Sequence, residues 1–337
     1  MLQVGENCWI EGKDKRMEPS VSVIIPMYQC ESYVKELISN LKEQTFKDFE
    51  VLLIDDGSTD HTVECCIETI GNDSRFRVCR QEHGGVSSAR NHGLRIAKGS
   101  FITFIDADDT IEHRYLEILY RAMEDCDIAI CNVVTVNENG TEKIAWRQYD
   151  KEEILTGASA RRELLHVWGP YGKMFSRQAI EGCFFDESLP IAEDMKFTTD
   201  YILKQDQRLK CVSGCRYYYR LHPGSVTNSG YCSGYVHALE AVTMSIHRLE
   251  VQNKLPKDCC LTGLFLSEAL SRWLKMPEDM KRSHMEDYTR IRSIGKRENK
   301  DVWKYILHCG LHPGMALFIM LYFPEIYCRI KGLTMVR

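Results

Sequence analysis

Short, apolar, β-branched runs alternate with stretches of helical periodicity along residues 19–136 of the chain. The run Val21–Pro26 has the composition of a strand that is buried on both faces. Val34, Leu37, Ile38 and Leu41 then recur at the spacing of one helix face. The same reasoning predicts strands at residues 49–54, 76–80, 101–105 and 128–134, and helices at residues 60–70, 86–97 and 115–123. This alternation predicts an α/β fold in which helices flank a mostly parallel sheet.

Acidic and turn residues stand directly after three of these expected strands. Pro26–Tyr28 follow the first strand, Asp55–Ser58 the second and Asp106–Asp109 the fourth. In a parallel sheet these positions share the edge at which ligands bind. Carboxylates separated by one residue can bind a hard divalent cation and leave coordination positions for phosphate, although such a pair is also common in solvated turns. Because crowded carboxylates repel one another unless a cation or donor is present, we predict a functional edge.

Charge and composition exclude several classes of protein. The net charge of −5 argues against a nucleic-acid binder, and the fifteen cysteines are scattered without the spacing of a zinc site or a disulfide scaffold. No apolar stretch is long enough to span a membrane, and no signal peptide is evident. We therefore expect a cytoplasmic protein.

The last part of the chain has a different charge from the rest. From Lys281 onward, eleven Lys or Arg residues stand against five Asp or Glu residues, and they are interspersed with aromatic residues such as Trp303, Phe318 and Phe323. This mixture is typical of helices that lie in an anionic membrane interface, here the inner face of the cytoplasmic membrane. A helical pair packed on the rest of the protein is the alternative.

Three segments, Val21–Asp60, Gly84–Gly93 and Asp106–Asp109, together resemble family 2 glycosyltransferases with the GT-A fold. Two later segments, Trp168–Lys173 and Ala192–Asp194, also fit the family, as does Arg220 with Ser225. The resemblance implies inverting transfer of a sugar from a nucleotide-sugar, most often a UDP-sugar. The acceptor would be a hydroxyl of a glycan or lipid-linked glycan in cell-surface polysaccharide synthesis.

The resemblance implies roles for individual residues. Pro26 and Tyr28 would belong to the nucleotide site, where Tyr28 would stack on the nucleotide base and Asp56 would accept a hydrogen bond from that base. Arg90 would lie near the nucleotide. Asp106 would lie near the ribose or the metal, and Asp108 would bind the Mn²⁺ or Mg²⁺ that neutralises the diphosphate.

The acceptor side also needs a group that removes a proton, because a sugar hydroxyl is a poor nucleophile at neutral pH. The resemblance assigns this role to Asp194. Donor-sugar and acceptor contacts would come from Trp168, Lys173, Glu193, Arg220 and Ser225. A Tyr-rich strand is expected at residues 217–220. Trp168 and the run Tyr217–Tyr219 fit equally well as core and sheet aromatics.

We expect three parts in the chain. Residues 1–18 form an extension, with Met17 as a candidate natural start. Residues 19–234 form the catalytic domain, with a nucleotide-binding half at 19–136 and an acceptor-side half at 137–234. Residues 235–337 form a helical region, in which Pro313 is placed to start a last helix that ends near Pro324.

The sequence departs from the family pattern in two places, and after the first strand it lacks the motifs of two other enzyme classes. Gln29 stands where the family often has Asn, and residues 137–166 carry no family motif. A sugar nucleotidyltransferase would need a Gly-rich, Arg-containing loop after the first strand, and a dinucleotide-binding dehydrogenase would need G-x-G-x-x-G there. A catalytically inactive partner or scaffold with the same fold is disfavoured because Asp106, Asp108 and Asp194 are all present.

Overall fold

The computed structural model describes residues 18–145, 147–204, 206–222, 230–257, 259–308 and 311–331. They divide into two compact units. The first comprises the chain up to Ala160, His166–Glu187 and Lys204–Pro223, and the second comprises Arg161–Leu165, Ser188–Leu203 and the chain from Gly224 onward. Met17 and Ser225 lie outside the described residues.

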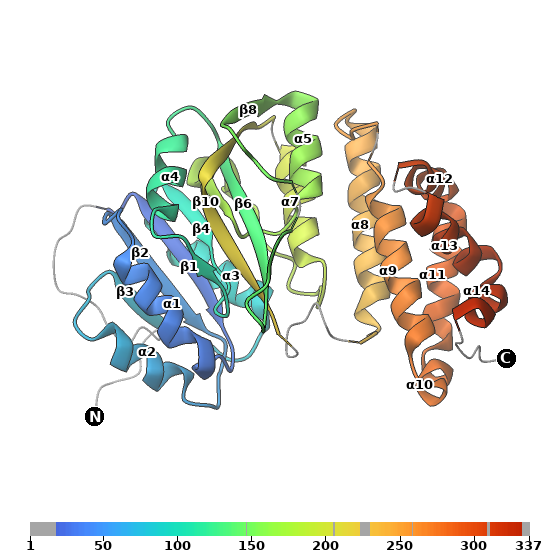
Figure 1. Cartoon of the computed structure of the whole chain (residues 1–337), viewed down its shortest axis with the longest axis horizontal. Helices are drawn as coiled ribbons and strands as arrows, with labels where there is room; N and C mark the ends of the chain where they lie inside the picture. Colours follow the sequence, from blue (N-terminus) through green and yellow to red (C-terminus); the bar gives the residue numbers. More distant parts are fainter. Residues whose placement is uncertain are drawn as a thin grey trace. The chain divides into compact units, whose positions relative to one another are not determined.

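The first unit is built on one sheet that has ten strands within the described residues (Figure 1). The main path through the sheet is β3-β2-β1-β4-β9-β6-β10-β5, with β7 beside β6 and β8 beside β10. The strands are β1 (Val21–Met27), β2 (Phe49–Asp55), β3 (Phe76–Arg80), β4 (Phe101–Phe104), β5 (Thr110–Ile111), β6 (Ile128–Asn137), β7 (Glu142–Ile144), β8 (Glu153–Thr156), β9 (Lys173–Ser176) and β10 (Arg208–Leu221).

The strands of the amino-terminal half pair in parallel. β1 lies between β2 and β4, and β3 continues the parallel set beyond β2. β9 lies antiparallel between β4 and β6, while β6 and β10 pair in parallel. Every residue of β1 and β2 is buried, which explains why both strands are almost continuously apolar.

Helices cover both faces of this sheet. The helices of the first unit are α1 (Glu31–Glu43), α2 (Thr62–Ile70), α3 (Val86–Ile96), α4 (Tyr115–Ala122), α5 (Gly157–His166), of which Arg161–Leu165 belong to the second unit, and α6 (Arg177–Ile180). Side chains of α1, α2 and α4 share one core with alternate residues of the strands. On the opposite face α3 packs on β1, where Gly93 lies against Ile24. The predicted α/β fold is confirmed.

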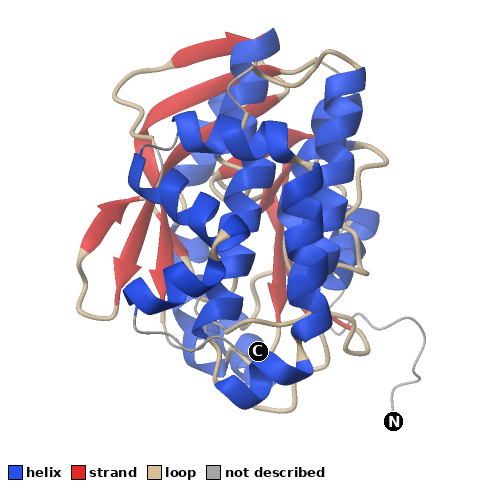
Figure 2. Ribbon diagram, turned by 90° about the vertical axis from the view of Figure 1, so that its right-hand side faces the viewer, coloured by secondary structure: helices blue, strands red, loops and turns tan. Residues whose placement is uncertain are grey.

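The second unit is helical (Figures 1 and 2). Its helices are α7 (Glu193–Lys204), α8 (Gly234–Val251), α9 (Leu261–Lys275), α10 (Glu278–Ser283), α11 (Met285–Arg297), α12 (Asn299–His308), α13 (Leu311–Tyr322) and α14 (Pro324–Lys331). α9 packs against α8, α11, α12 and α13, and its buried Trp273 stacks on Tyr288 of α11 at 4.1 Å between ring centroids. Within the described residues, no helix combines the length and the apolar character needed to cross a bilayer.

Some boundaries differ from the prediction for physical reasons. The helix expected to be the last, α13, ends at Tyr322, but Pro324 then starts the further helix α14. A proline suits the first position of a helix, since its missing N–H has no intrahelical partner there. β10 begins at Arg208, well before the Tyr-rich run. Its first half largely alternates buried with more exposed residues, which suits a strand with one face on the core.

Gly93 generates a stability prediction. A Cβ at this position would lie 2.4 Å from Cγ2 of buried Ile24. We expect Gly93→Ala to lower the free energy of unfolding by about 1–3 kcal/mol through overpacking, despite the higher helix propensity of alanine. Gly230, where an added Cβ meets nothing within 4 Å, provides the control variant Gly230→Ala. Equal stability of both variants in urea denaturation would contradict this account of the α3–β1 packing.

Candidate functional site

The parallel register brings three loops to one edge of the sheet. Met27 at the end of β1 pairs with Asp55 at the end of β2, and Ile24 of β1 pairs with Phe104 at the end of β4. The loops that follow these strands begin at Tyr28, Asp56 and Ile105. The Asp56 N–H donates to the Met27 carbonyl at 2.8 Å, which joins the first two loops directly.

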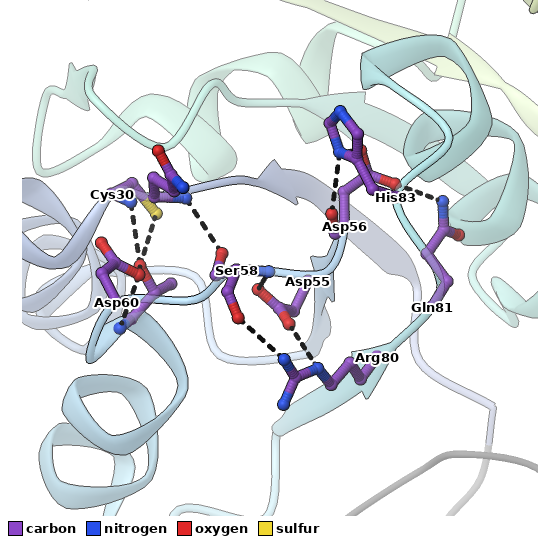
Figure 3. Close-up of polar contacts among 10 residues, drawn as sticks. Cys30, Asp55, Asp56, Ser58, Asp60, Arg80, Gln81 and His83 are labelled. Carbon is purple, nitrogen blue, oxygen red and sulfur yellow. Dashed lines mark hydrogen bonds and ion pairs between the residues drawn. The ribbon is translucent and has the colours of Figure 1, made fainter.

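Asp56 is the centre of a hydrogen-bond network, and Figure 3 shows its contacts with Gln81 and His83. Its carboxylate is 2% exposed and accepts from the backbone N–H groups of Gly84 at 2.9 Å and Gly85 at 2.8 Å. It also accepts from Nε2 of Gln81 at 2.8 Å and contacts Nδ1 of His83 at 2.8 Å. Gly85 caps α3, so the charge of Asp56 lies at the amino terminus of a helix, where a negative charge is favoured.

Tyr28 lies beside this network. Its side chain is 46% exposed, and its ring stacks on the ring of His83 at 4.3 Å between centroids with 28° between the planes. An exposed aromatic face next to a buried carboxylate suits a planar ring that carries N–H donors. Pro26, by contrast, is a buried residue of β1.

The turn after β2 is held from two sides. Arg80 pairs with Asp55 at 3.2 Å and donates to the Ser58 carbonyl at 2.7 Å (Figure 3). The Gln29 N–H donates to Oγ of Ser58 at 2.9 Å. Gln29 has φ of +49°, a left-handed conformation that asparagine adopts more readily than most residues. The asparagine that the family often has there therefore suits this backbone.

The acidic turn Asp106–Asp109 follows β4. Asp106 pairs through Oδ1 with the guanidinium of Arg90 at 2.8 Å, and Arg90 is 4% exposed. Oδ2 of Asp108 contacts Nε2 of His222 at 2.8 Å. Asp109 is 1% exposed and accepts from the Tyr217 hydroxyl at 2.6 Å and from the N–H of Arg220 at 2.8 Å.

The protonation of this turn is strongly influenced by its surroundings. Burial raises the pKa of the Asp108 carboxyl, and the neighbouring Asp106 raises it further against the opposing effect of His222. Burial raises the pKa of Asp109 well above its usual value, and Asp106 and Asp108 add to this increase. A bound cation would stabilise the charged forms of these carboxyls, which burial and mutual repulsion disfavour.

The acidic turn fits a cation that is bound only partly by protein. Among the residues described, no group of three or more His, Cys, Asp or Glu side chains is arranged to hold a metal ion. Mg²⁺ and similar ions in nucleotide sites are commonly held by one or two carboxylates, with the remaining ligands supplied by phosphate and water. Asp106 and Asp108 satisfy that smaller requirement.

The later predicted residues of the first unit lie in different environments. Lys173 in β9 is 1% exposed, and its ammonium donates to the Gly169 carbonyl. Trp168 is partly buried. The guanidinium of Arg220 pairs with Glu36 at 2.8 Å and lies over the ring of Tyr33.

Glu193 and Asp194 belong to the second unit, where they begin α7 and are partly exposed. The preceding residue, Ala192, has φ of +62°, a left-handed conformation that is strained for a residue with a Cβ. Oδ1 of Asp194 accepts from the Met195 N–H at 2.7 Å. Ser225 lies outside the described residues.

Comparison with known proteins agrees with these motifs. Residues 22–184 match the family model described as Glycosyl transferase family 2. This segment of the chain belongs to glycosyltransferase family 2. Its similarity to that family, drawn above from motifs, is thereby confirmed.

Several bacterial family members are similar to this family 2 chain. The uncharacterized glycosyltransferase EpsJ of Bacillus subtilis is 31% identical over 225 residues, which are 64% of this chain and 65% of EpsJ. The chain thus spans slightly less than two thirds of EpsJ. Glycosyltransferase GlyG of Streptococcus pneumoniae is 26% identical over 281 residues, 79% of this chain and 89% of GlyG.

Solved structures support the fold of this family 2 protein. The crystal structure of Staphylococcus aureus TarS 1–349 in complex with UDP-GlcNAc has a TM-score of 0.65 and 23% sequence identity. The match covers 93% of this chain and 92% of that one. At this identity the likeness establishes a GT-A fold and no more.

Sequence reasoning missed several residues of the site. Gln81 and His83 contact Asp56, and Tyr217 links the acidic turn to β10, with its hydroxyl also accepting from the Asp106 N–H at 3.1 Å. The Tyr-rich run signalled β10 in this family 2 chain. Nothing in the spacing of that run indicated that Tyr217 is the side chain that reaches Asp106, 111 positions earlier.

The contacts of the Tyr217 hydroxyl predict that its removal lowers the stability of the fold. Tyr217→Phe removes the hydroxyl that bridges Asp109 and the backbone of Asp106. We expect the free energy of unfolding to fall by about 1–3 kcal/mol, because Asp109 stays buried with one donor fewer. Tyr218→Phe is the control, since its hydroxyl contacts Glu112 at 3.5 Å and Arg216 but does not bind the acidic turn, and its removal should change stability by less than ~0.5 kcal/mol. Thermal denaturation with equal shifts for both variants would contradict the bridging role.

Proposed function

We propose that this protein is a metal-dependent, inverting glycosyltransferase that transfers a sugar from a UDP-sugar to a hydroxyl of a glycan or lipid-linked glycan in surface polysaccharide synthesis. The observation that carries the proposal is the shared sheet edge, where the Tyr28 ring and the Asp56 carboxylate stand beside the acidic turn Asp106–Asp109. Neighbouring loops at this edge offer one set of contacts for a base and another for a charged diphosphate.

The donor side follows from the groups at this edge. Tyr28 offers an exposed ring for stacking. The Asp56 carboxylate is buried and accepts from Gly84, Gly85 and Gln81, so a base N–H would take the place of one of these donors. Uracil carries such an N–H beside two carbonyl groups. TarS, which shares the fold, has been crystallised with UDP and with UDP-GlcNAc, which supports a UDP-sugar as the first donor to test.

The acidic turn would hold Mn²⁺ or Mg²⁺ through Asp108, with Asp106 near the ion or the ribose. When bound, the ion would neutralise charge that develops on the leaving diphosphate. Asp106 is oriented by Arg90, and Asp108 is contacted by His222. Arg90, in this proposal, acts near the nucleotide through its contact with Asp106.

For the acceptor side we propose Asp194 as the general base. A carboxylate that takes the proton of the attacking hydroxyl, on the face opposite the leaving diphosphate, inverts the anomeric configuration. The left-handed backbone of Ala192 directly before α7 is a feature that clusters at functional sites, and it supports this assignment. Contacts to the sugars from Trp168, Lys173, Glu193, Arg220 and Ser225 remain predictions.

The function is tested with a panel of UDP-, GDP- and dTDP-sugars in the presence and absence of Mn²⁺. We expect metal-dependent release of one nucleoside diphosphate. Asp108→Ala and Asp194→Asn should each lower turnover by about 100-fold or more, since a positioned base or charge-stabilising group typically contributes that much. Asp125→Ala changes an exposed carboxylate outside the site and is the control. Absence of turnover and of metal-dependent nucleotide binding would instead indicate an inactive partner or scaffold.

The helical unit has features of a membrane-contacting surface. Trp303 of α12 and Phe323, which follows α13, are 47% and 51% exposed, and both rings contact Phe318. Ile326 and Ile330 of α14 are 52% and 67% exposed. Basic side chains accompany them, including Lys300 with 82% of its side chain exposed. We propose that this surface touches anionic lipid at the membrane interface without crossing it.

Vesicle binding tests this part of the proposal. The double variant Trp303→Ser with Phe323→Ser should lose at least about tenfold in affinity for vesicles that contain phosphatidylglycerol, because burial of one large apolar side chain is worth about 1.5–3 kcal/mol. Val251→Ser removes an 84% exposed apolar residue of α8 and is the control. Unchanged binding of the double variant, or no binding by the wild type, would refute membrane contact through this surface.

A further inference from the structure

Asn91 of α3 forms an unusual tether within the first unit. It is 2% exposed, and its side-chain amide exchanges two hydrogen bonds with the backbone of Phe185, 94 positions later. Nδ2 donates to the Phe185 carbonyl at 2.8 Å, and the Phe185 N–H donates to Oδ1 at 2.8 Å. Nδ2 also donates to Oε1 of Glu187 at 2.8 Å. The amide therefore binds residues 185–187 much as a neighbouring strand would.

The side chain of Phe185 reaches the acidic turn through two contacts. The guanidinium carbon of Arg90 lies 5.2 Å from the centroid of the Phe185 ring. The same ring meets Phe104, the last residue of β4, edge to face at 5.4 Å. Arg90 in turn pairs with Asp106, which comes two residues after Phe104. Phe185 thus contacts both the strand that leads to Asp106 and the cation that orients it.

We propose that Asn91 is a positioning residue for the acidic turn. By fixing the backbone of Phe185, it holds that ring against Arg90 and Phe104 and so sets where the Asp106 carboxylate lies. Two adjacent residues of one helix act together, since Arg90 pairs with the carboxylate and Asn91 holds the ring that supports Arg90. This inference rests on the proposed function, in which Asp106 serves the nucleotide and its metal.

A structural role alone would make a different prediction. If Asn91 only stabilised the fold, its removal would lower stability without a specific effect on ligand binding. If it positions Asp106, its removal would weaken metal-dependent nucleotide binding more than an equally destabilising change elsewhere. Residues that orient a metal site from behind its ligands typically affect metal affinity or activity by about 10–100-fold.

The chain offers a closely matched control. Asn132 of β6 is 7% exposed and makes the same reciprocal pair of bonds with the backbone of Tyr149, at 3.1 Å from Nδ2 to the carbonyl and 2.7 Å from the N–H to Oδ1. Asn132→Ala therefore removes the same chemical groups from a buried tether whose bonds lead to Tyr149 and not to Phe185 beside Arg90. Comparison of the two alanine variants therefore distinguishes the general effect of losing a tether from a specific displacement of the acidic turn.

The experiment measures UDP binding by titration calorimetry, with and without Mn²⁺, for wild type, Asn91→Ala and Asn132→Ala, together with the melting temperature of each. We expect similar losses of thermal stability in the two variants. Asn91→Ala should weaken UDP binding in Mn²⁺ by about tenfold, and Asn132→Ala by less than about threefold. Equal affinities of the two variants would overturn the proposal.

Hydrogen exchange provides a readout that does not depend on a ligand. Amides of residues 101–109 should exchange faster in Asn91→Ala than in Asn132→Ala, and identical exchange there would also overturn the proposal. If Asn91→Ala does not fold, Phe185→Leu decides, since it keeps the backbone tether but removes the ring that supports Arg90. It should reproduce the weaker binding and faster exchange, and wild-type values for both would refute the inference.

These outcomes are distinct from failure of the proposed function. A wild-type protein that binds no UDP in Mn²⁺ would refute the nucleotide site itself. The positioning role would then be judged by the exchange of residues 101–109 alone.

Discussion

The parallel pairing of β1 with β2 on one side and β4 on the other is the constraint on which the rest of the first unit depends. It places Met27 beside Asp55 and Ile24 beside Phe104, so the chain leaves all three strands at one edge. Tyr28, Asp56 and Asp106 are far apart in sequence, and this pairing places all three at the same edge of the sheet. Burial of the three strands between helices makes the pairing stable, because a strand covered on both faces excludes water from its hydrogen bonds.

The shared edge concentrates negative charge, and the protein balances that charge with donors from distant elements. Arg90 of α3 pairs with Asp106, the Tyr217 hydroxyl and the Arg220 N–H bind Asp109, and His222 contacts Asp108. The pKa values of the Asp108 and Asp109 carboxyls are nevertheless raised, because these donors do not fully offset the effects of burial and of the neighbouring carboxylates. Titratable groups perturbed in this way are frequent at functional sites, which supports the proposal that this edge binds the diphosphate and its ion.

Asparagine side chains hold several of the connecting segments. Asn40 of α1 exchanges two 2.9 Å hydrogen bonds with the backbone of Ile111 in the short strand β5, and Asn91 and Asn132 make the same reciprocal contact with Phe185 and Tyr149. A side-chain amide can pair with both the N–H and the C=O of one residue, as a neighbouring strand does. Such tethers satisfy backbone groups in segments that have no full strand partner, and they join residues that are far apart in sequence.

The sequence by itself determined the elements of the nucleotide half and the places of its motifs. Apolar periodicity identified β1 to β4 and the helices between them, since burial on one or both faces leaves a regular pattern in the chain. The order of the motifs was enough to indicate family 2, and acidic residues after strands indicated the functional edge. The local pattern also indicated the Tyr-rich strand β10, although not its full length.

Only the tertiary structure decided which side chains meet. The antiparallel insertion of β9, the contact of His83 with Asp56, the bridge from Tyr217 to Asp109 and the tether from Asn91 to Phe185 join residues separated by tens of positions or more. No periodicity records such pairings, because each depends on the direction of one side chain and on the close packing of two elements. Periodicity in the sequence shows which face of each helix or strand is buried, whereas long-range packing decides which other element that face contacts.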